Sequence, residues 1–217
     1  MGVNSVRCSH NPPDEALPLS ELHTLLNKDP QTETLRHTQA IANLLFQFGG
    51  MPFVDLAHLE KSNLNQGLLK YNRMKTGTPM SVEIIDSAYE LLSLLRNNHS
   101  SSCSDRPDYL FHILSGEYKR GEEGAYREYQ SALRKFNNHL KSLSRKLRLH
   151  SSVTSYTLRH SWATTAKYRG VPIEMISESL GHKSIKTTQI YLKGFELEER
   201  TKVNKQNYYY VRRFKIA

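Results

Sequence analysis

The residues best suited to chemistry lie in one segment, residues 157–193, which reads TLRHSWATTAKYRGVPIEMISESLGHKSIKTTQIYLK. Arg159 and His160 open the segment, a Leu-Gly-His sequence then contains His182, and Tyr191 follows it. A guanidinium can neutralise a phosphate bidentately, an imidazole can donate to a non-bridging oxygen, and a phenol can act as a nucleophile. These residue types are the set that a metal-free attack on a phosphodiester would need.

The order and spacing of these motifs resemble the tyrosine recombinases, the phage-type integrases. In that family Arg-His-x-x-Ala-Thr is followed by Leu-Gly-His and then by the nucleophilic tyrosine. The resemblance covers roughly residues 17–197 and implies that Arg159, His182 and Tyr191 are catalytic. It also implies that a lysine on a hairpin protonates the departing 5′ oxygen, and Lys75 in a Lys-Thr-Gly sequence matches that place.

Two positions depart from the family pattern. The family normally carries a first catalytic arginine after an apolar helix, and Gly49 occupies its place here. Arg73 is a candidate replacement, because residues two apart in a strand share a face and Arg73 should then point the same way as Lys75. An unrelated strand arginine is the competing interpretation. Tyr156 stands where the family usually has a histidine, which resembles integrases of the Bacteroides type.

Each candidate also has a purely structural interpretation. Tyr191 is one of 12 tyrosines, Lys75 could be an ordinary turn lysine, and His182 could cap a helix that ends at Gly181. Arg159 opens an apolar helix, and a buried arginine requires an anionic partner, which a phosphate could be. Further candidates for contact with DNA are Tyr156, His160 and Lys183, of which His160 also suits a structural role.

The composition agrees with a polyanionic partner. Thirty lysines and arginines against 21 acidic residues give the 217-residue chain a net charge of +9, with an isoelectric point near 9.5. A basic protein with scattered charge and no nucleic acid partner would have the same composition.

The apolar runs of the sequence are shorter than the roughly 18 residues that a membrane helix needs. We therefore expect no membrane. Cys8 and Cys103 form no metal or redox spacing, so we expect no metal and a reducing cytoplasm, which the resemblance to Bacteroides-type integrases implies is bacterial.

The hydrophobic pattern predicts a mainly α fold with a small antiparallel β-sheet, the catalytic-domain fold of the tyrosine recombinases. A hairpin is expected over residues 68–85, with its turn at Thr76-Gly77-Thr78-Pro79, and a strand over residues 207–217. The expected domains are a linker or flexible terminus (1–16), the catalytic domain (17–206) and a tail (207–217). Helices are expected at residues 18–22 (the first turn), 34–48, 87–96, 126–147, 158–168, 172–180 and 184–193, and a loop over residues 97–107. The helix over residues 126–147 carries one apolar stripe. Pro172 fits a first helical position, Gly181 a helix end and Ser184 an N-cap.

The resemblance implies that the chain cuts and rejoins DNA through a 3′-phosphotyrosyl intermediate, without a cofactor. Its partners would be double-stranded DNA and a homo-tetramer on that DNA, and its role would be integration or excision of a mobile element. A type IB topoisomerase-like activity would share this chemistry. A non-catalytic DNA-binding protein on a decayed scaffold is the alternative of another class: Gly49 and Tyr156 favour it, and the intact catalytic residues oppose it.

Overall fold

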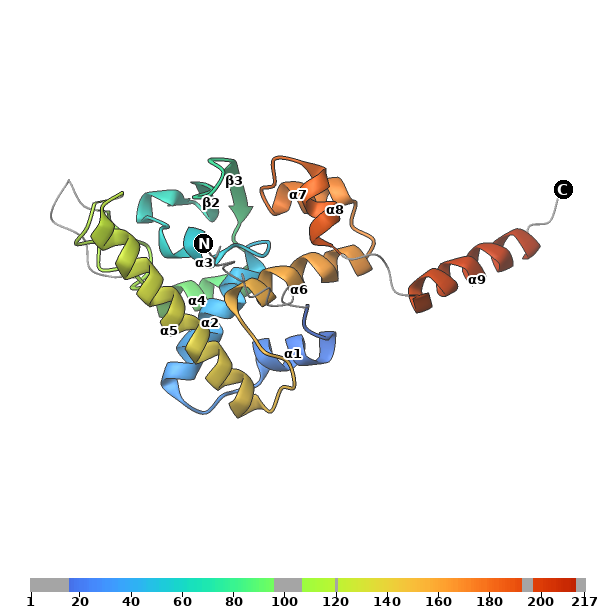
Figure 1. The fold of residues 1–217 in the computed structure, drawn as a ribbon, viewed down its shortest axis with the longest axis horizontal. Helices are drawn as coiled ribbons and strands as arrows, with labels where there is room; N and C mark the ends of the chain where they lie inside the picture. Colours follow the sequence, from blue (N-terminus) through green and yellow to red (C-terminus); the bar gives the residue numbers. More distant parts are fainter. Residues whose placement is uncertain (1–15, 96–106, 120, 193–196, 214–217) are drawn as a thin grey trace, which may run out of the picture.

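Helices form most of the structure, and one small antiparallel sheet lies among them (Figure 1). The structure is a computed structural model that describes residues 16–95, 107–119, 121–192 and 197–213. It confirms the expected class, mainly α with a small antiparallel sheet. The linker expected over residues 1–16 and the loop expected over residues 97–107 lie, except for their last residues, outside the described residues.

The helices and strands follow the hydrophobic pattern closely, and one further short strand, β1, precedes the expected hairpin. In chain order they are α1 (Leu19–Asn27), α2 (Glu33–Gln47), α3 (Phe53–Ala57), the 3-10 turn η1 (Lys61–Asn63), β1 (Leu64–Asn65), β2 (Leu68–Asn72), β3 (Pro79–Glu83), α4 (Asp86–Leu95), α5 (Glu123–Leu147), α6 (Ser155–Tyr168), α7 (Ile173–Ser179), α8 (Ile185–Tyr191) and α9 (Leu197–Arg213).

The core forms where the long helix α5 packs against α2. Apolar residues three and four apart share one face of a helix, and on α5 this face buries Phe136 and Leu140, which belong to the same core as Leu44 of α2. The predicted apolar stripe over residues 126–147 is confirmed except at its start, where Tyr126 is exposed at the first turns of α5. The basic side chains along this helix and its carboxyl end are exposed: Arg127, Arg134, Lys135, Lys141, Arg145, Lys146 and Arg148.

The sheet confirms the predicted hairpin. Its order is β1-β2-β3, and both pairs are antiparallel. Leu69, which pairs with Val82, and Tyr71 are buried, whereas Lys70 between them is exposed. This alternation is the period of two that a strand with one covered face requires, and it fixes the register of the hairpin.

Three consecutive helices, α6 to α8, carry most of the candidate site. A capping box starts α6: the Thr154 hydroxyl accepts from the Thr157 backbone N–H at 3.1 Å, and the Thr157 hydroxyl accepts from the Thr154 N–H at 3.2 Å. Gly181, with a φ of +63°, follows the end of α7, and Ser184 caps α8. The predictions for Gly181 and Ser184 are confirmed, whereas Pro172 precedes α7 as its N-cap instead of opening it.

Two groups of buried side chains hold these elements together. The main core joins α1 to α6 and the sheet, and it also includes the segment that follows α4. A second group, which we call the satellite cluster, consists of Ala163, Ile176, Leu180 and Leu192. It joins α6 to α7 and to the residue after α8. A few apolar side chains therefore attach α7 and α8 to the rest of the molecule.

The strand expected over residues 207–217 is wrong for the part of it that the structure describes. Residues 207–213 continue α9, a helix that lies apart from the other elements in Figure 1. Its last turn carries Arg212 and Arg213, cations at the end where the helix dipole favours them. The aromatic residues of this segment, three consecutive tyrosines among them, favoured a strand. A strand needs a partner, however, and the three described strands pair only with one another. In the described chain, we find no helix with the length and apolarity that crossing a bilayer demands.

Candidate active site

Arg159 is the centre of the candidate site. It lies in the second turn of α6, and its side chain is only 6% exposed. Its Nη1 donates to the carbonyl oxygen of Gly50 at 2.8 Å, and its Nη2 donates to the carbonyl oxygen of Leu180 at 2.7 Å. Two fixed acceptors hold the planar guanidinium between the turn after α2 and the end of α7, so its orientation is set before any ligand arrives.

Arg73 meets Arg159 at the same carbonyl oxygen, because its Nη1 also donates to Leu180. It lies just beyond the end of β2 and is 7% exposed, whereas Lys75 is exposed on the turn. The prediction that Arg73 and Lys75 share an outward strand face is therefore wrong. The chain leaves the strand after Asn72 and turns, so the period of two no longer applies. The structure nevertheless brings Arg73 into the site.

Asp55 of α3 is the buried carboxylate of this site, and the sequence analysis missed it. Its side chain is 2% exposed, and its Oδ1 accepts from the backbone N–H of Met74 at 2.9 Å. Its Oδ2 lies 2.7 Å from the Arg73 Nε as an ion pair, without the angle of a hydrogen bond. Burial raises the pKa of Asp55, while the Met74 N–H and the charges of Arg73, Arg159 and His58 act the other way. A lone aspartate inside the apolar run FVDLA was the available signal.

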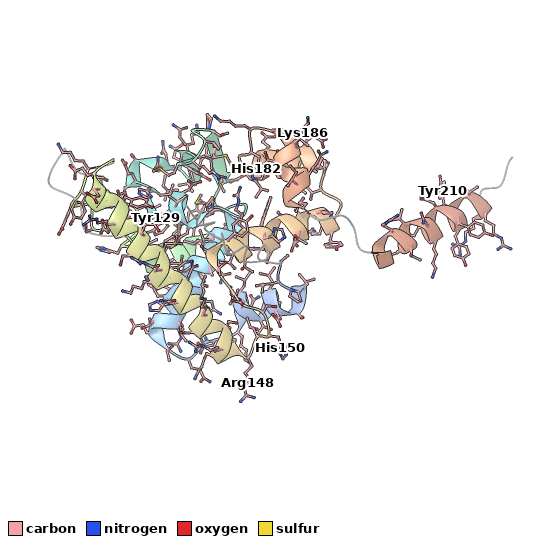
Figure 2. All side chains as sticks on the ribbon, in the orientation of Figure 1. Tyr129, Arg148, His150, His182, Lys186 and Tyr210 are labelled. Atoms are coloured by element: carbon pink, nitrogen blue, oxygen red, sulfur yellow. The ribbon has the colours of Figure 1, made fainter. Side chains whose placement is uncertain are left out.

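His182 completes the group, on the side of α7 and α8 that faces β3 (Figure 2). Its Nε2 lies 3.3 Å from the Arg159 Nη2, and its Nδ1 lies 2.8 Å from the Thr188 hydroxyl. Burial, followed by the positive charges of Arg159, Arg73 and Lys75, lowers the pKa of His182 to about 4. The imidazole is thus neutral at pH 7. Thr188, which sequence analysis also missed, is buried beneath it.

A pocket of about 250 Å³ lies beside His182, between the β2–β3 hairpin and the helices α7 and α8. Thr78 and Pro79 line it from the hairpin, and Glu178 and Lys183 line it from the other side. Lys75 lies on the same hairpin turn. Its charge is among those that lower the pKa of His182, so Lys75 is close to the group even though it is exposed.

Tyr191 is the last residue of α8, about one helical turn beyond Thr188. Only its backbone is described. The α8 helix also contributes Thr188 to the histidine, so the helix that carries Tyr191 is joined directly to the arginine and histidine group.

The position of the missing arginine lies against the site. Gly49 has a φ of +71°, and a Cβ built there would lie 3.7 Å from the carbonyl oxygen of Ser179. The next residue, Gly50, provides the carbonyl that holds Arg159. An arginine at position 49 would have room but a strained backbone, because non-glycine residues rarely adopt such a φ.

The three further candidates for DNA contact differ in exposure. Tyr156 and Lys183 are exposed, whereas His160 is buried. The rings of Tyr156 and His160 lie nearly parallel, 16° apart in angle with centroids 6.4 Å apart. This geometry suits His160 as a support beneath Tyr156. DNA contact by all three residues stays a prediction.

Across the described residues, histidine, cysteine and carboxylate side chains form no group of three or more that could hold a metal ion.

Known proteins are similar to this chain over most of its length. Residues 15–197 match the Phage integrase family. The chain is 31% identical over 137 residues to the probable integrase/recombinase protein MJ0367 of Methanocaldococcus jannaschii, covering 63% of this chain and 39% of that protein. It is 28% identical over 181 residues to the tyrosine recombinase XerA of Thermococcus kodakarensis, covering 82% and 58%. The chain therefore spans between 39% and 58% of the length of these relatives.

Solved structures share the fold. The crystal structure of XerA recombinase superimposes with a TM-score of 0.62 at 22% identity, covering 96% of this chain and 66% of that one. The Tn1549 transposon integrase, in complex with a circular intermediate DNA, gives a TM-score of 0.64 at 13% identity, covering 90% and 67%.

Proposed function

The chain belongs to the phage integrase family, the tyrosine recombinases, and on that premise we propose that it cuts and rejoins DNA through a 3′-phosphotyrosyl intermediate. The observation that carries the proposal is the meeting of Arg73 and Arg159 at one carbonyl oxygen, with His182 in contact with Arg159. Buried guanidiniums that are fixed in orientation are suited to stabilise the charge that develops on a phosphate during attack.

The charges of the site favour an anion. Arg73 and Arg159 each bring one positive charge, and Lys75 on the hairpin turn adds to the field. Against them, Asp55 brings at most one negative charge, and burial raises its pKa. Glu174 and Glu178 line the neighbouring pocket together with Lys183, so these groups sum to four positive charges and at most three negative ones. The scissile phosphate of DNA is the anion that we assign to this excess of positive charge.

In the proposed step the phenol of Tyr191 gives up its proton to solvent, its oxygen attacks the phosphorus, and a bond from phosphorus to that oxygen forms. The bond from phosphorus to the 5′ oxygen breaks, and Lys75 donates a proton to the departing oxygen. Because a free phenol has a pKa of about 10, attack near neutral pH depends on the positive field of Arg73 and Arg159. A 5′ hydroxyl can then attack the phosphotyrosyl bond and rejoin the strand, without ATP.

Arg73 is our candidate for the arginine that Gly49 lacks. Its place next to Arg159 supports this assignment. Its ion pair with Asp55 argues against it, because a carboxylate that already neutralises the guanidinium weakens the attraction of that guanidinium for a phosphate. Removal of a charge-stabilising donor typically costs about 10²–10³ in rate, so a family member without the first arginine needs such a replacement.

For the partners, we propose double-stranded DNA and a homo-tetramer on two duplexes, in the integration or excision of a mobile element. The exposed basic side chains of α5, together with Lys183, support contact with the phosphate backbone. Tyr156 in place of the usual histidine supports a Bacteroides-type integrase. If these contacts form, duplex affinity should fall with salt at a log–log slope of about −0.9 per neutralised phosphate.

A nicked suicide substrate decides between enzyme and scaffold. Loss of the short fragment beyond the nick prevents rejoining, so a covalent protein–DNA adduct accumulates if the protein cleaves. We expect an adduct with the parent chain and none with Tyr191→Phe, which should bind DNA as before because it loses only a hydroxyl. DNA binding without any adduct from the parent would instead identify a non-catalytic DNA-binding protein.

A further inference from the structure

Thr188 contacts the histidine of the site from a position that solvent does not reach. Its side chain is 0% exposed, on the inner face of α8, and its hydroxyl lies 2.8 Å from the Nδ1 of His182. Thr187 beside it and Gln189 after it are exposed. A buried hydroxyl costs free energy unless it is hydrogen-bonded, so the bond to the imidazole accounts for a polar residue here.

The contacts of His182 fix which of its nitrogens carries the proton. A guanidinium has donors and no acceptor, so the 3.3 Å contact from the Arg159 Nη2 makes Nε2 the accepting nitrogen. The imidazole is neutral at pH 7, since its pKa is lowered to about 4. Its single proton therefore resides on Nδ1, and Nδ1–H donates to the Thr188 hydroxyl oxygen.

A phosphate in the site would require the opposite arrangement. To bind a non-bridging oxygen, a neutral His182 must donate from Nε2, and Nδ1 then becomes an acceptor. The exchange leaves the number of protons unchanged: one leaves Nδ1 to solvent and one is taken up at Nε2. A hydroxyl can serve both states by rotation, because it carries one donor and two acceptor lone pairs.

We propose that Thr188 is a positioning residue that holds the His182 imidazole and lets it exchange its accepting tautomer for its donating tautomer when a phosphate binds. This inference rests on the function proposed above. Because Thr188 and Tyr191 lie on the same short helix, the bond to His182 also sets the distance between the nucleophile's helix and the arginines.

The test compares three single variants on the nicked suicide substrate under single-turnover conditions. Thr188→Val keeps the shape of the side chain but removes the hydroxyl, Thr188→Ser keeps the hydroxyl, and Thr187→Val makes the same change at the exposed neighbour. We expect Thr188→Val to slow adduct formation by about 10- to 100-fold, the range that loss of an orienting partner costs a metal-bound histidine. Thr188→Ser and Thr187→Val should stay within about threefold of the parent, and all three should bind duplex DNA as the parent does.

A double variant separates an effect through His182 from a general structural effect. If Thr188 acts through the imidazole, Thr188→Val should have little further effect in a His182→Ala background. Adduct formation by Thr188→Val at the parent rate would overturn the proposal, as would an equal loss in both backgrounds. Failure of the parent chain to form any adduct would instead overturn the proposed function, so the two failures are distinguishable.

The tautomer can also be read directly in the DNA-free protein. Histidine ¹⁵N resonances distinguish the two neutral forms, and the His182→Ala spectrum identifies the signal. We expect the Nδ1–H form at pH 7 in the parent chain. A predominant Nε2–H form would contradict the proton assignment and, with it, the proposed exchange.

Discussion

The two halves of the candidate site are built differently. Arg73 and Arg159 lie in the main body, where Asp55 of α3 holds Arg73 through an ion pair and the Gly50 carbonyl holds Arg159. Tyr191 lies on α8, and the part of the chain that includes α7 and α8 is attached to that body by the small satellite cluster and by the contacts of the two arginines with Leu180 and His182. The charge-stabilising half is thus rigidly preset, and the half with the proposed nucleophile rests on few contacts.

Leu180 is where the two halves meet. Its side chain is fully buried in the satellite cluster, and its carbonyl oxygen accepts from both arginines. Regions with few buried apolar contacts open at low free energy, so we expect α7 and α8 to open before the main core does. By this difference the groups that we propose to bind phosphate stay fixed while the helix that carries the proposed nucleophile is adjusted.

The largest effect is expected from Arg159→Ala. Loss of this guanidinium removes charge stabilisation from the phosphate and leaves two buried carbonyls with fewer donors, so adduct formation should fall by at least about 10²–10³. Arg159→Lys should recover little, because an ammonium lacks the planar fork that reaches Gly50 and Leu180 together. Single-turnover assays measure both, with Arg169→Ala on the exposed end of α6 as the matched control. Adduct formation by Arg159→Lys at the parent rate would show that the site needs only the positive charge and not the shape of the guanidinium.

The next effect concerns Arg73, whose loss should lower the stability of the fold as well as the rate of cleavage. Because Arg73 is buried against Asp55, Arg73→Met should leave a buried carboxylate unpaired and cost about 3–5 kcal/mol in the free energy of unfolding. Adding Asp55→Asn should restore much of that stability, which urea unfolding measures. Cleavage should stay low in the double variant if Arg73 contacts the phosphate. A stable double variant that cleaves like the parent would make Arg73 purely structural.

A smaller difference is expected between the two clusters. Leu140→Ala in the main core should lower the global free energy of unfolding by about 2–5 kcal/mol. Ile176→Ala in the satellite cluster should lower it less, because α7 and α8 can open without the rest. Hydrogen exchange should instead rise selectively in α7 and α8, and cleavage should fall more than in Leu140→Ala at a temperature where both remain folded. Uniformly faster exchange in Ile176→Ala would remove the distinction between the two halves.

The smallest effect concerns pH. The pKa of His182 is lowered to about 4, against about 6.5 for a free histidine, so between these values the unfolded chain binds a proton that the folded chain does not. Stability should therefore fall as the pH is lowered through this window. His182→Gln should make urea midpoints less dependent on pH, whereas Thr187→Val, which removes no titrating group, should leave the dependence as it is. An unchanged dependence in His182→Gln would contradict the lowered pKa.

The sequence predicted local structure well where the pattern was periodic or a turn residue was decisive. The spacing of apolar residues predicted α5, and Gly181 and Ser184 marked the boundaries between α7 and α8. The family resemblance carried by the arginine and histidine motifs also implied that Arg159 and His182 belong to one site, and the structure brings them together. In each case the determining interaction is local, or it is carried by the motif itself.

What the sequence missed depends on how the elements pack against one another. Asp55 enters the site because α3 packs near the hairpin, and Thr188 because α8 turns its inner face toward His182. Arg73 was expected to point the same way as Lys75 because both were assigned to a strand, whereas β2 ends at Asn72. The tyrosines of α9 suggested a strand, since β propensity is a weak guide when no partner strand is available.

The most direct test of the account identifies the residue that is bonded to DNA. The adduct from the suicide substrate is digested with protease and nuclease, and mass spectrometry locates the nucleotide that remains on a peptide. We predict a single modified tyrosine, Tyr191, attached to the 3′ phosphate, with a free 5′ hydroxyl on the released fragment. Attachment at another tyrosine, such as those of α9, or at a 5′ phosphate would contradict the assignment of this site.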